Sequence, residues 1–265
     1  MHPAYEFLNG WADRILAVTI PRATERQARL RERLAGLRVE LVHGLDCRDL
    51  DRADLIRDGI YDDRRARAVH RHGKPMPLGQ IGCAVGHRAA YEEMLRSGCA
   101  RAVVFEDDVL PIPGALEHLP AALGQLPPDW ELCYLGYAKH ETVTPSLRAK
   151  QGVYLVLSAL RLMRWTPAEV LRLLPKPFSP NLKAAGLHHC AHAYALTLAG
   201  ARKLAAANRP VAHNADELFC HLVLRGELSA YVSEPKFFEQ DSMAASVPRD
   251  VPPGEPLSFI HEHGA

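Results

Sequence analysis

The sequence predicts an α/β domain, a mixed and mainly parallel sheet flanked by helices. Three observations carry this prediction. The composition is that of a globular protein, since the 265 residues are 48% hydrophobic and 24% charged. Short apolar runs of strand length alternate with longer amphipathic runs of helix length. The first three runs follow one another as strand, helix and strand within about thirty residues, which is typical of parallel sheets. We expect a single domain over residues 1–265.

The first three elements are indicated by composition and by helix-end signals. Residues 14–20 (RILAVTI) have the apolar, β-branched composition of a buried strand. Thr24, three residues before Gln27, matches a capping box that opens a helix, and Gly36 would end it. Residues 37–42 (LRVELV) alternate as a second strand should.

The later elements continue the alternation. We expect helices at residues 86–97 and 199–207, and strands at residues 101–105, 130–135 and 192–198.

One more helix is indicated by its two ends. Asn214 can cap it, with Glu217 at the third position, and Gly226 follows its last turn. Asp216 would lie in the first turn. There an acid complements the helix dipole, which is the simpler interpretation of the residue alone; the alternative is a general base.

Two stretches lack a clear pattern. Residues 64–74 (RRARAVHRHGK) are basic and without periodicity, which predicts a mobile loop. Residues 138–189 have the least regular pattern, which predicts an insertion on the acceptor side of the domain. Within them, residues 155–176 are amphipathic and cationic around Trp165. This stretch could hold an acceptor or contact a membrane surface, but a pair of core helices broken at Pro167 is the simpler interpretation.

Charge and hydropathy limit the class of partner and the location. Lys and Arg number 32 against 31 for Asp and Glu, so no nucleic-acid partner is expected from bulk charge. No apolar run reaches the ~18 residues of a membrane-spanning helix. The first residues have no basic start followed by an apolar core, so we expect no secretory signal and a cytoplasmic location. Six cysteines without a CxxC pair predict free, mostly buried thiols: Cys47, Cys83, Cys99, Cys133, Cys190 and Cys220.

The strongest candidate site is an acidic triplet, Glu106-Asp107-Asp108, directly after the apolar strand at residues 101–105. Ligands of α/β sheets bind at the carboxyl ends of strands. Strand alternation places Glu106 and Asp108 on one side and Asp107 on the other. Adjacent carboxylates repel one another unless a cation lies between them, and oxygen ligands suit Mg²⁺ or Mn²⁺. A solvated loop is the alternative, but the buried strand before the triplet favours a metal site.

Two further groups could contact a phosphate or a sugar. Arg22 and Arg26 follow the first strand, where nucleotide-binding sheets commonly meet the nucleotide, and arginine binds phosphates through its planar fork. Alternatively, both arginines lie on a solvated helix face. Gly82 belongs to a run of glycines that permits close backbone approach. His87 could hydrogen-bond a sugar or phosphate, although a lone helical histidine is more often a core or capping group.

Three histidines cluster near the start of a predicted strand: His188, His189 and His192. A zinc site is only weakly indicated, because Cys190 is the one thiol nearby and no acid lies at a useful spacing. One of the histidines could instead complete a metal shell with Glu106 and Asp108.

Taken together, these segments resemble glycosyltransferase family 25, the lipooligosaccharide galactosyltransferases and their collagen-galactosyltransferase relatives. Gln80 departs from the family pattern, which usually has Glu there, and Gly86 stands in place of Ser. The similar segments occur in the family's order: residues 17–30 (AVTIPRATERQARL), 78–95 (LGQIGCAVGHRAAYEEML), 103–109 (VVFEDDV), 191–204 (AHAYALTLAGARKL), 210–219 and 235–246 (PKFFEQDSMAAS).

The resemblance implies a GT-A-type fold and an inverting transfer of a hexose, galactose or glucose. The donor would be a UDP-sugar, and the acceptor a hydroxyl of a saccharide or glycolipid such as lipooligosaccharide, with possible peripheral membrane contact. It implies Mn²⁺ or Mg²⁺ at Glu106 and Asp108, acting as a Lewis acid on the leaving diphosphate. Asp216 would be the catalytic base, with Asp107 in reserve. The donor would contact Arg22, Arg26, Gly82, His87, Glu106, His192 and Gln240.

Two alternatives belong to other classes. The chain could glycosylate a soluble small molecule, or it could bind a sugar nucleotide without catalysis, since a fold does not fix an activity. The retained acidic triplet argues against the second alternative.

Overall fold

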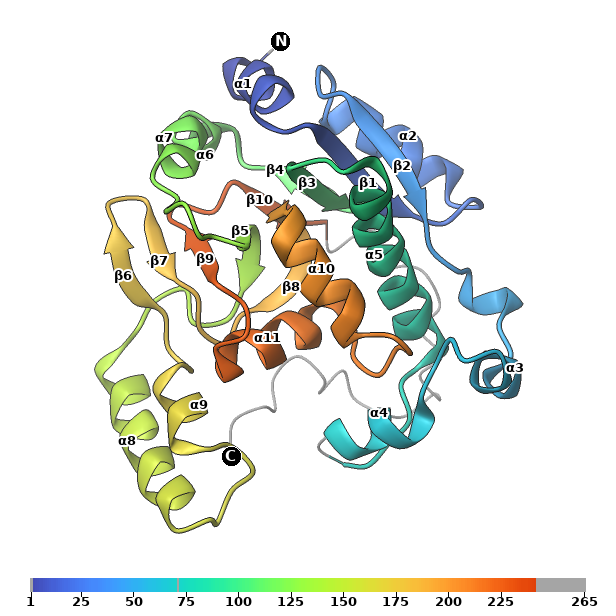
Figure 1. Cartoon of the computed structure of the whole chain (residues 1–265). Helices are drawn as coiled ribbons and strands as arrows, with labels where there is room; N and C mark the ends of the chain where they lie inside the picture. The colour runs from blue at the N-terminus through green and yellow to red at the C-terminus, as the bar shows by residue number, and fades with distance from the viewer. Residues whose placement is uncertain (1, 71, 242–265) are drawn as a thin grey trace.

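The centre of the fold is an eight-stranded mixed sheet with helices on both faces (Figure 1). A computed structural model describes residues 2–70 and 72–241. A smaller sheet pairs β4 (Val109–Pro111) with β10 (Phe238–Gln240) in antiparallel fashion. The strands of the large sheet, in sheet order, are β2 (Val39–His43), β1 (Arg14–Thr19), β3 (Arg101–Glu106), β8 (His189–Thr197), β5 (Leu132–Ala138), β9 (Ala230–Ser233), β7 (Leu182–Ala184) and β6 (Lys176–Ser179).

The strand directions bring several strand ends to one edge of the sheet. β1 pairs in parallel with β2 and β3, and β5 pairs in parallel with β9. β8 lies antiparallel between β3 and β5. The carboxyl ends of β1, β3 and β5 therefore lie at the same edge as the start of β8. β6 and β7 complete the sheet with antiparallel pairings.

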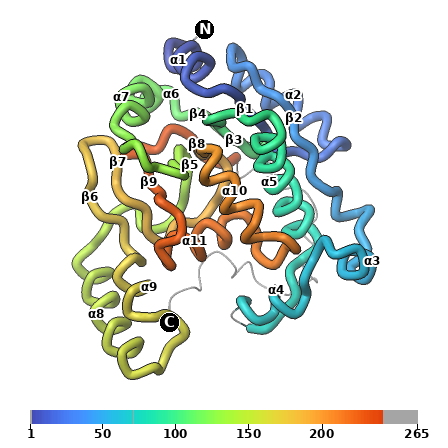
Figure 2. Tube along the Cα trace, in the orientation of Figure 1, coloured from blue at the N-terminus to red at the C-terminus, as the bar shows by residue number. Residues whose placement is uncertain are grey.

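The helices divide between the two faces of the sheet. Figures 1 and 2 show α5, α10 and α11 together on one face, and α8 and α9 side by side beside β6. The α-helices are α1 (Pro3–Trp11), α2 (Thr24–Arg33), α3 (Arg52–Arg57), α4 (Asp63–Val69), α5 (Leu78–Ser97), α6 (Pro113–Leu116), α7 (Leu119–Gly124), α8 (Pro145–Ala159), α9 (Pro167–Leu171), α10 (Leu198–Ala207) and α11 (Ala215–Arg225).

Alternate residues of the central strands enter two separate cores. Val103 and Phe105 of β3 pack with α1, α2, α6 and α7. Ala102 and Val104 pack with α5, α10 and α11 on the other face. Because β3 is covered on both faces, its sequence is apolar at every one of these positions, as expected for a central strand of an α/β sheet.

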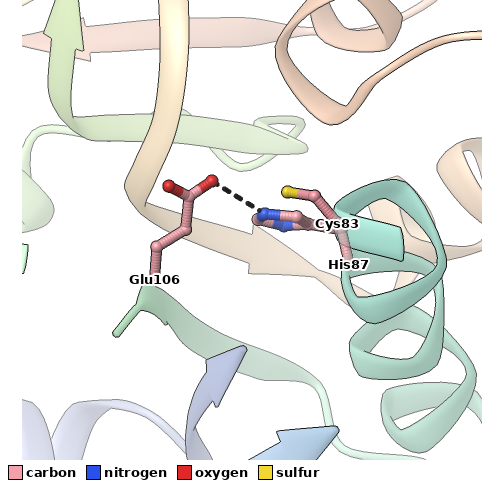
Figure 3. A group of neighbouring side chains, drawn as sticks. All are labelled: Cys83, His87 and Glu106. Carbon is pink, nitrogen blue, oxygen red and sulfur yellow. Dashed lines mark hydrogen bonds and ion pairs between the residues drawn. The ribbon is translucent and has the colours of Figure 1, made fainter. Parts of the chain in front are cut away.

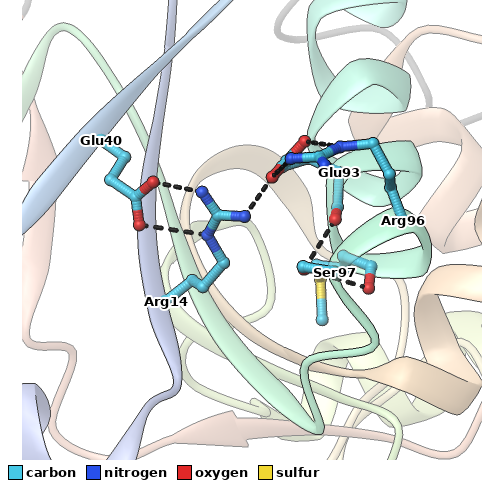
Figure 4. Close-up of polar contacts among 6 residues, drawn as sticks. Arg14, Glu40, Glu93, Arg96 and Ser97 are labelled. Atoms are coloured by element: carbon cyan, nitrogen blue, oxygen red, sulfur yellow. Dashed lines mark hydrogen bonds and ion pairs between the residues drawn. The ribbon is translucent and has the colours of Figure 1, made fainter.

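A charged contact fixes α5 against the edge of the sheet. The guanidinium of Arg14, at the start of β1, contacts Glu40 of β2 and Glu93 of α5 (Figure 4). Glu93 also accepts hydrogen bonds from Arg96, one turn later in α5. The contact joins β1, β2 and α5 at the opposite end of the sheet from the carboxyl ends of β1 and β3.

The strands predicted from residues 14–20, 37–42, 101–105, 130–135 and 192–198 are all present, with ends shifted by a few residues. The helices expected at residues 199–207 and after Asn214 are confirmed. All six cysteines are free thiols, although Cys47, Cys83 and Cys190 are only partly buried. None of the helices in residues 2–70 and 72–241 is both long and apolar enough to cross a membrane.

Three local predictions were wrong. Thr24 does not cap α2: Ala23 occupies the cap position, and the Gln27 side chain donates to the carbonyl of Ile20 instead. Residues 64–74 are not wholly a loop, because Asp62 caps α4 by accepting a hydrogen bond from the backbone of Arg65.

The stretch at residues 138–189 is also more regular than predicted. It contains the two helices α8 and α9, and β6 and β7 follow as a hairpin of the main sheet. Thr166 opens α9 with a complete capping box, in which Glu169 reaches back to the backbone of Thr166. The break between the two helices lies before Pro167, as the interpretation of a broken helix pair expected.

Candidate functional site

Acidic side chains converge where β3 ends, β8 begins and α11 begins. Glu106 is the last residue of β3, and Asp216 lies in the first turn of α11. The thiols of Cys83 and Cys190 each lie within electrostatic reach of Glu106, Asp108 and Asp216, whose negative charges add to burial in raising the pKa of both thiols. Asp216 also accepts a hydrogen bond from Cys190 N at the start of β8, which pairs with β3, so the triplet and Asp216 lie at the same edge of the sheet.

Asp107 follows the last residue of β3, in the turn that leads to β4, and has its own partners on β1 and α2. Its Oδ2 accepts a hydrogen bond of 2.5 Å from Thr19 Oγ1, and its Oδ1 lies 3.1 Å from Arg26 Nη1. Burial raises the pKa of Asp107, although Thr19 and Arg26 both favour its ionised form. Both oxygens are thus engaged in tying β3 to β1 and α2.

Glu106 faces α5. Its Oε1 lies 3.0 Å from His87 Nε2, and His87 Nδ1 lies 2.8 Å from the hydroxyl of Tyr194. His87 is fully enclosed, with 1% of its side chain exposed, whereas Glu106 keeps 20% of its side chain exposed. The predicted interpretation of His87 as a core group therefore holds, but one of its nitrogens faces a site carboxylate.

Asp108 is the acid of the triplet that has a buried carboxylate oxygen without a hydrogen-bond partner among the described residues. Its Oδ2 accepts a hydrogen bond of 2.9 Å from Gln240 Nε2 of β10. Its Oδ1 is buried and has no hydrogen-bond partner among the described residues. Burial, followed by the charge of Glu106, raises the pKa of Asp108 to about 7. An unsatisfied carboxylate oxygen beside a second carboxylate fits a hard divalent cation, which would offset both charges.

Asp216 is held by backbone and side-chain donors around the start of α11. Its Oδ2 accepts a hydrogen bond of 3.1 Å from Cys190 N, and its Oδ1 accepts one of 2.9 Å from Glu217 N. His189 Nδ1 lies 3.7 Å from Asp216 Oδ2. Burial opposes ionisation, but the donors from His189 and Cys190 outweigh it and hold the pKa of Asp216 below its ordinary value. Asp216 is therefore ionised at neutral pH.

The predicted donor-binding residues occupy different positions. Arg22 is exposed, and its Nη2 lies 3.0 Å from Asp49 Oδ2, outside the triplet. Gly82 is explained by packing: a Cβ there would lie 2.2 Å from the carbonyl oxygen of Leu45. His192 is buried with its Nε2 3.3 Å from the carbonyl of Phe238. His192 Nδ1 is buried and lacks a partner among the described residues.

The other predicted histidines take different roles. His188 is buried, its Nδ1 lies 2.9 Å from the carbonyl of Lys139, and burial lowers its pKa to about 3. His189 lies beside Asp216, as described above. The similar segment at residues 235–246 is described as far as residue 241, and the rest lies outside the described residues.

Sequence reasoning missed two features of this region. Glu217 appeared only as a helix-capping residue, yet burial and the charge of Asp216 raise its pKa to about 7. Three residues at the neighbouring strand ends have left-handed backbone: Lys139 (φ 68°), His140 (φ 53°) and Cys190 (φ 71°). Such conformations are uncommon for residues other than glycine and gather at functional sites. No sequence pattern identifies them.

The sequence is similar to proteins of one known family. Residues 13–219 match the model of glycosyltransferase family 25, described as an LPS biosynthesis protein. A probable inactive glycosyltransferase 25 family member 3 from Bos taurus is 28% identical over 204 residues, which cover 73% of this chain and 29% of the relative. The inactive member 3 from Homo sapiens is 34% identical over 137 residues, 51% of this chain and 18% of the relative.

A relative whose name states a transferase activity is similar as well. Procollagen galactosyltransferase 1-A from Xenopus laevis is 25% identical over 143 residues, 50% of this chain and 22% of the relative. The chain spans less than a third of the length of each of these three relatives. The family model, in contrast, covers most of the chain and includes the acidic triplet and Asp216. The chain belongs to glycosyltransferase family 25.

Proposed function

We propose that the protein is an active, metal-dependent hexosyltransferase that moves galactose or glucose, with inversion, from a UDP-sugar to a hydroxyl of a saccharide or glycolipid. The observation that carries the proposal is that Glu106 ends β3 with Asp108 two residues later, while Asp216 accepts a hydrogen bond from Cys190 at the start of the adjacent strand β8. An inverting transfer needs a cation for the leaving diphosphate and a base on the opposite face of the sugar.

Glu106 and Asp108 are the residues proposed to hold Mn²⁺ or Mg²⁺. The unpaired Oδ1 of Asp108 supports this assignment, and Gln240 orients the other oxygen of the same carboxylate. A bound divalent ion would act as a Lewis acid that stabilises the charge of the departing UDP. The buried His192, which has an unpaired ring nitrogen among the described residues, and the exposed Arg22 are the proposed contacts to the donor.

Asp216 is the proposed base. It is ionised at neutral pH, as a base must be, and it belongs to a different element from the proposed metal ligands. Asp107, the reserve candidate, is less suited because Thr19 and Arg26 occupy its oxygens. Glu217 lies next to Asp216 and has a pKa of about 7, which suits it to take the proton onward.

The names of two relatives raise a second candidate, a sugar-nucleotide-binding protein without activity. Incubation with UDP-galactose or UDP-glucose and Mn²⁺ separates the two. A transferase releases UDP slowly without an acceptor, whereas a binding protein retains the intact donor. Asp108→Asn is the control and should abolish UDP release while the circular dichroism spectrum stays unchanged. If the wild type binds the UDP-sugar but releases no UDP, the inactive alternative is established.

A glycolipid acceptor is proposed from the exposed surface of α8 and the loop after it. Leu155 packs against a small core with α9 and α11, so one side of α8 covers the protein itself. Val153 and Val156 are nevertheless 57% and 60% exposed, and Leu160 and Leu162 are 63% and 70% exposed. Arg161 and Arg164 lie beside them and are exposed. Apolar side chains flanked by cations suit an anionic membrane surface, from which a glycolipid would be presented.

A further inference from the structure

A group of three potential metal ligands lies between α5 and the end of β3. Cys83 Sγ, a ring nitrogen of His87 and a carboxylate oxygen of Glu106 all lie within 4.8 Å of one another. Figure 3 shows Cys83 and His87 projecting from α5 toward Glu106. Cys83 and His87 are four residues apart in a helix, which places both on the same face. Helix and strand thus bring together three side chains of different ligand type.

We propose that Cys83, His87 and Glu106 form a binding site for Zn²⁺ that overlaps the hard-cation site at Glu106 and Asp108, with Glu106 common to both. Thiolate sulfur, imidazole nitrogen and carboxylate oxygen are the ligand types that zinc combines, whereas Mg²⁺ and Mn²⁺ favour oxygen. Three protein ligands leave a fourth tetrahedral position for water. Tetrahedral ligands at zinc bond lengths of roughly 2.0–2.3 Å lie about 3.5 Å apart. His87 Nε2 and Glu106 Oε1, at 3.0 Å, need to separate slightly, and no pair of ligand atoms in the cluster is more than 4.8 Å apart.

The surroundings of His87 resemble the support that metal-bound histidines usually have. One ring nitrogen faces Glu106, and the other lies 2.8 Å from the hydroxyl of Tyr194. Tyr194 in turn lies 3.4 Å from the hydroxyl of Tyr91. A partner on the second nitrogen fixes the orientation and tautomer of a metal-bound imidazole. The ring is therefore already aimed at the position that zinc would take.

The packing of α5 holds the two helical ligands in place. A Cβ on Gly82 would lie 2.2 Å from the carbonyl oxygen of Leu45, and one on Gly86 would lie 2.6 Å from Val18 Cγ1. The glycines therefore let α5 approach the chain after β2 and the side of β1 closely. Cys83 and His87 alternate with these glycines along α5, so their distance from β3 is set by backbone packing. Such preorganisation favours a metal site.

The two cation sites share Glu106, which gives zinc a regulatory effect. This step depends on the proposed function. When Glu106 binds zinc together with Cys83 and His87, it is withdrawn from Asp108. Zinc and Mn²⁺ therefore compete, and zinc inhibits the transfer. The thiol of Cys83 loses its proton to solvent when zinc binds, so one proton per chain is released into the buffer.

The site is tested on the full chain without donor, using Co²⁺ as a spectroscopic probe and Zn²⁺ in calorimetric titration. We expect one equivalent of Co²⁺ to give a thiolate-to-cobalt charge-transfer band that Zn²⁺ abolishes. Cys83→Ser should remove the band and weaken Zn²⁺ binding by at least about 100-fold, and Tyr194→Phe should weaken it by about 10-fold. Cys47→Ser, which changes a thiol outside the cluster, is the matched control and should change neither measurement.

Three results would overturn the inference: a charge-transfer band that persists in Cys83→Ser, no band in a wild type with a native circular dichroism spectrum, or loss of the band in Asp108→Asn. Cys83→Ala serves as the second variant if Cys83→Ser does not fold. Asp108→Asn separates this inference from the proposed function, because it should abolish UDP release but keep the cobalt band. Loss of the band in Asp108→Asn would show that the thiolate site needs Asp108 and would reject a site formed by Cys83, His87 and Glu106.

Discussion

Gln240 Nε2 donates a hydrogen bond of 2.9 Å to Asp108 Oδ2 and thereby connects β10 to the end of the acidic triplet. The backbone supports the same contact, since Asp241 N donates to the carbonyl oxygen of Asp108 at 2.8 Å. Gln240 also pairs with Val109 in the small sheet of β4 and β10. The small sheet therefore holds Asp108 in position, and Gln240 acts on the site through this carboxylate.

The pKa of Asp108 predicts a pH dependence of metal binding. The pKa of Asp108 in the folded chain, about 7, lies above the ordinary aspartate value of 3.8, so between these pH values the folded chain holds more protons than the unfolded chain. Asp108 therefore contributes most to the free energy of unfolding of the metal-free protein at low pH, and this contribution is lost as the pH rises through 7. Mn²⁺ competes with the same proton, so its affinity should fall about tenfold per pH unit below pH 7.

Calorimetric titration of Mn²⁺ between pH 5 and 8 measures this dependence. Asp108→Asn should bind weakly with little pH dependence. A wild-type affinity that is constant from pH 5 to 8 would contradict the assignment of Asp108 as a ligand.

Arg26 is expected to contribute to stability through Asp107. Arg26→Ala removes the ion pair with the buried carboxylate of Asp107 and leaves its hydrogen bond from Thr19. We expect this change to lower the free energy of unfolding by about 1–3 kcal/mol. Urea unfolding measures the loss. Arg29→Ala changes an exposed arginine of the same helix and should cost less than about 0.5 kcal/mol. Equal stabilities of the two variants would mean that the ion pair contributes nothing.

The glycines of α5 should differ sharply in their tolerance of a methyl group. Gly82→Ala forces a Cβ to 2.2 Å from the backbone oxygen of Leu45, so we expect destabilisation of about 1–3 kcal/mol. Gly79→Ala has nothing within 4 Å of the new Cβ and should be neutral or stabilising by up to about 1 kcal/mol. Thermal and urea unfolding compare the pair, and a destabilising Gly79→Ala would refute this account of α5.

The exposed surface of α8 is tested by sedimentation with vesicles. The wild type should pellet with anionic vesicles and remain in solution with neutral ones. Reversing two charges with Arg161→Glu and Arg164→Glu should weaken binding at least about tenfold, because each cation near an anionic surface contributes about 1 kcal/mol. Negligible pelleting of both proteins would favour a soluble acceptor instead.

The elements that can be predicted from sequence are those whose own composition decides their structure. β1 and β3 are apolar between their end residues because both of their faces are covered, and the Asn214 side chain caps α11 by accepting from Glu217 N at 2.8 Å. α5 begins at Leu78, well before residue 86, because glycines that weaken a helix locally are required here for tertiary packing. That requirement lies in the partner segment at Gly44 and Leu45, which no local pattern indicates.

The site divides in the same way. Strand alternation applies only as far as Glu106, because Asp107 and Asp108 form the turn between β3 and β4. The partners of these acids come from Thr19, His87 and Gln240, and only the fold brings such distant residues together. The left-handed backbone of Lys139, His140 and Cys190 is likewise a product of tertiary structure.

Those three left-handed residues have a consequence for protein engineering. Each holds a side chain in a conformation that costs roughly 1–2 kcal/mol and that glycine adopts freely. Selection for heat resistance alone should therefore enrich glycine at positions 139, 140 and 190. Selection for turnover should restore the original residues, since Lys139 and Cys190 border the donors around His189 and Asp216. At this edge of the sheet, thermostability and activity are expected to evolve in opposite directions.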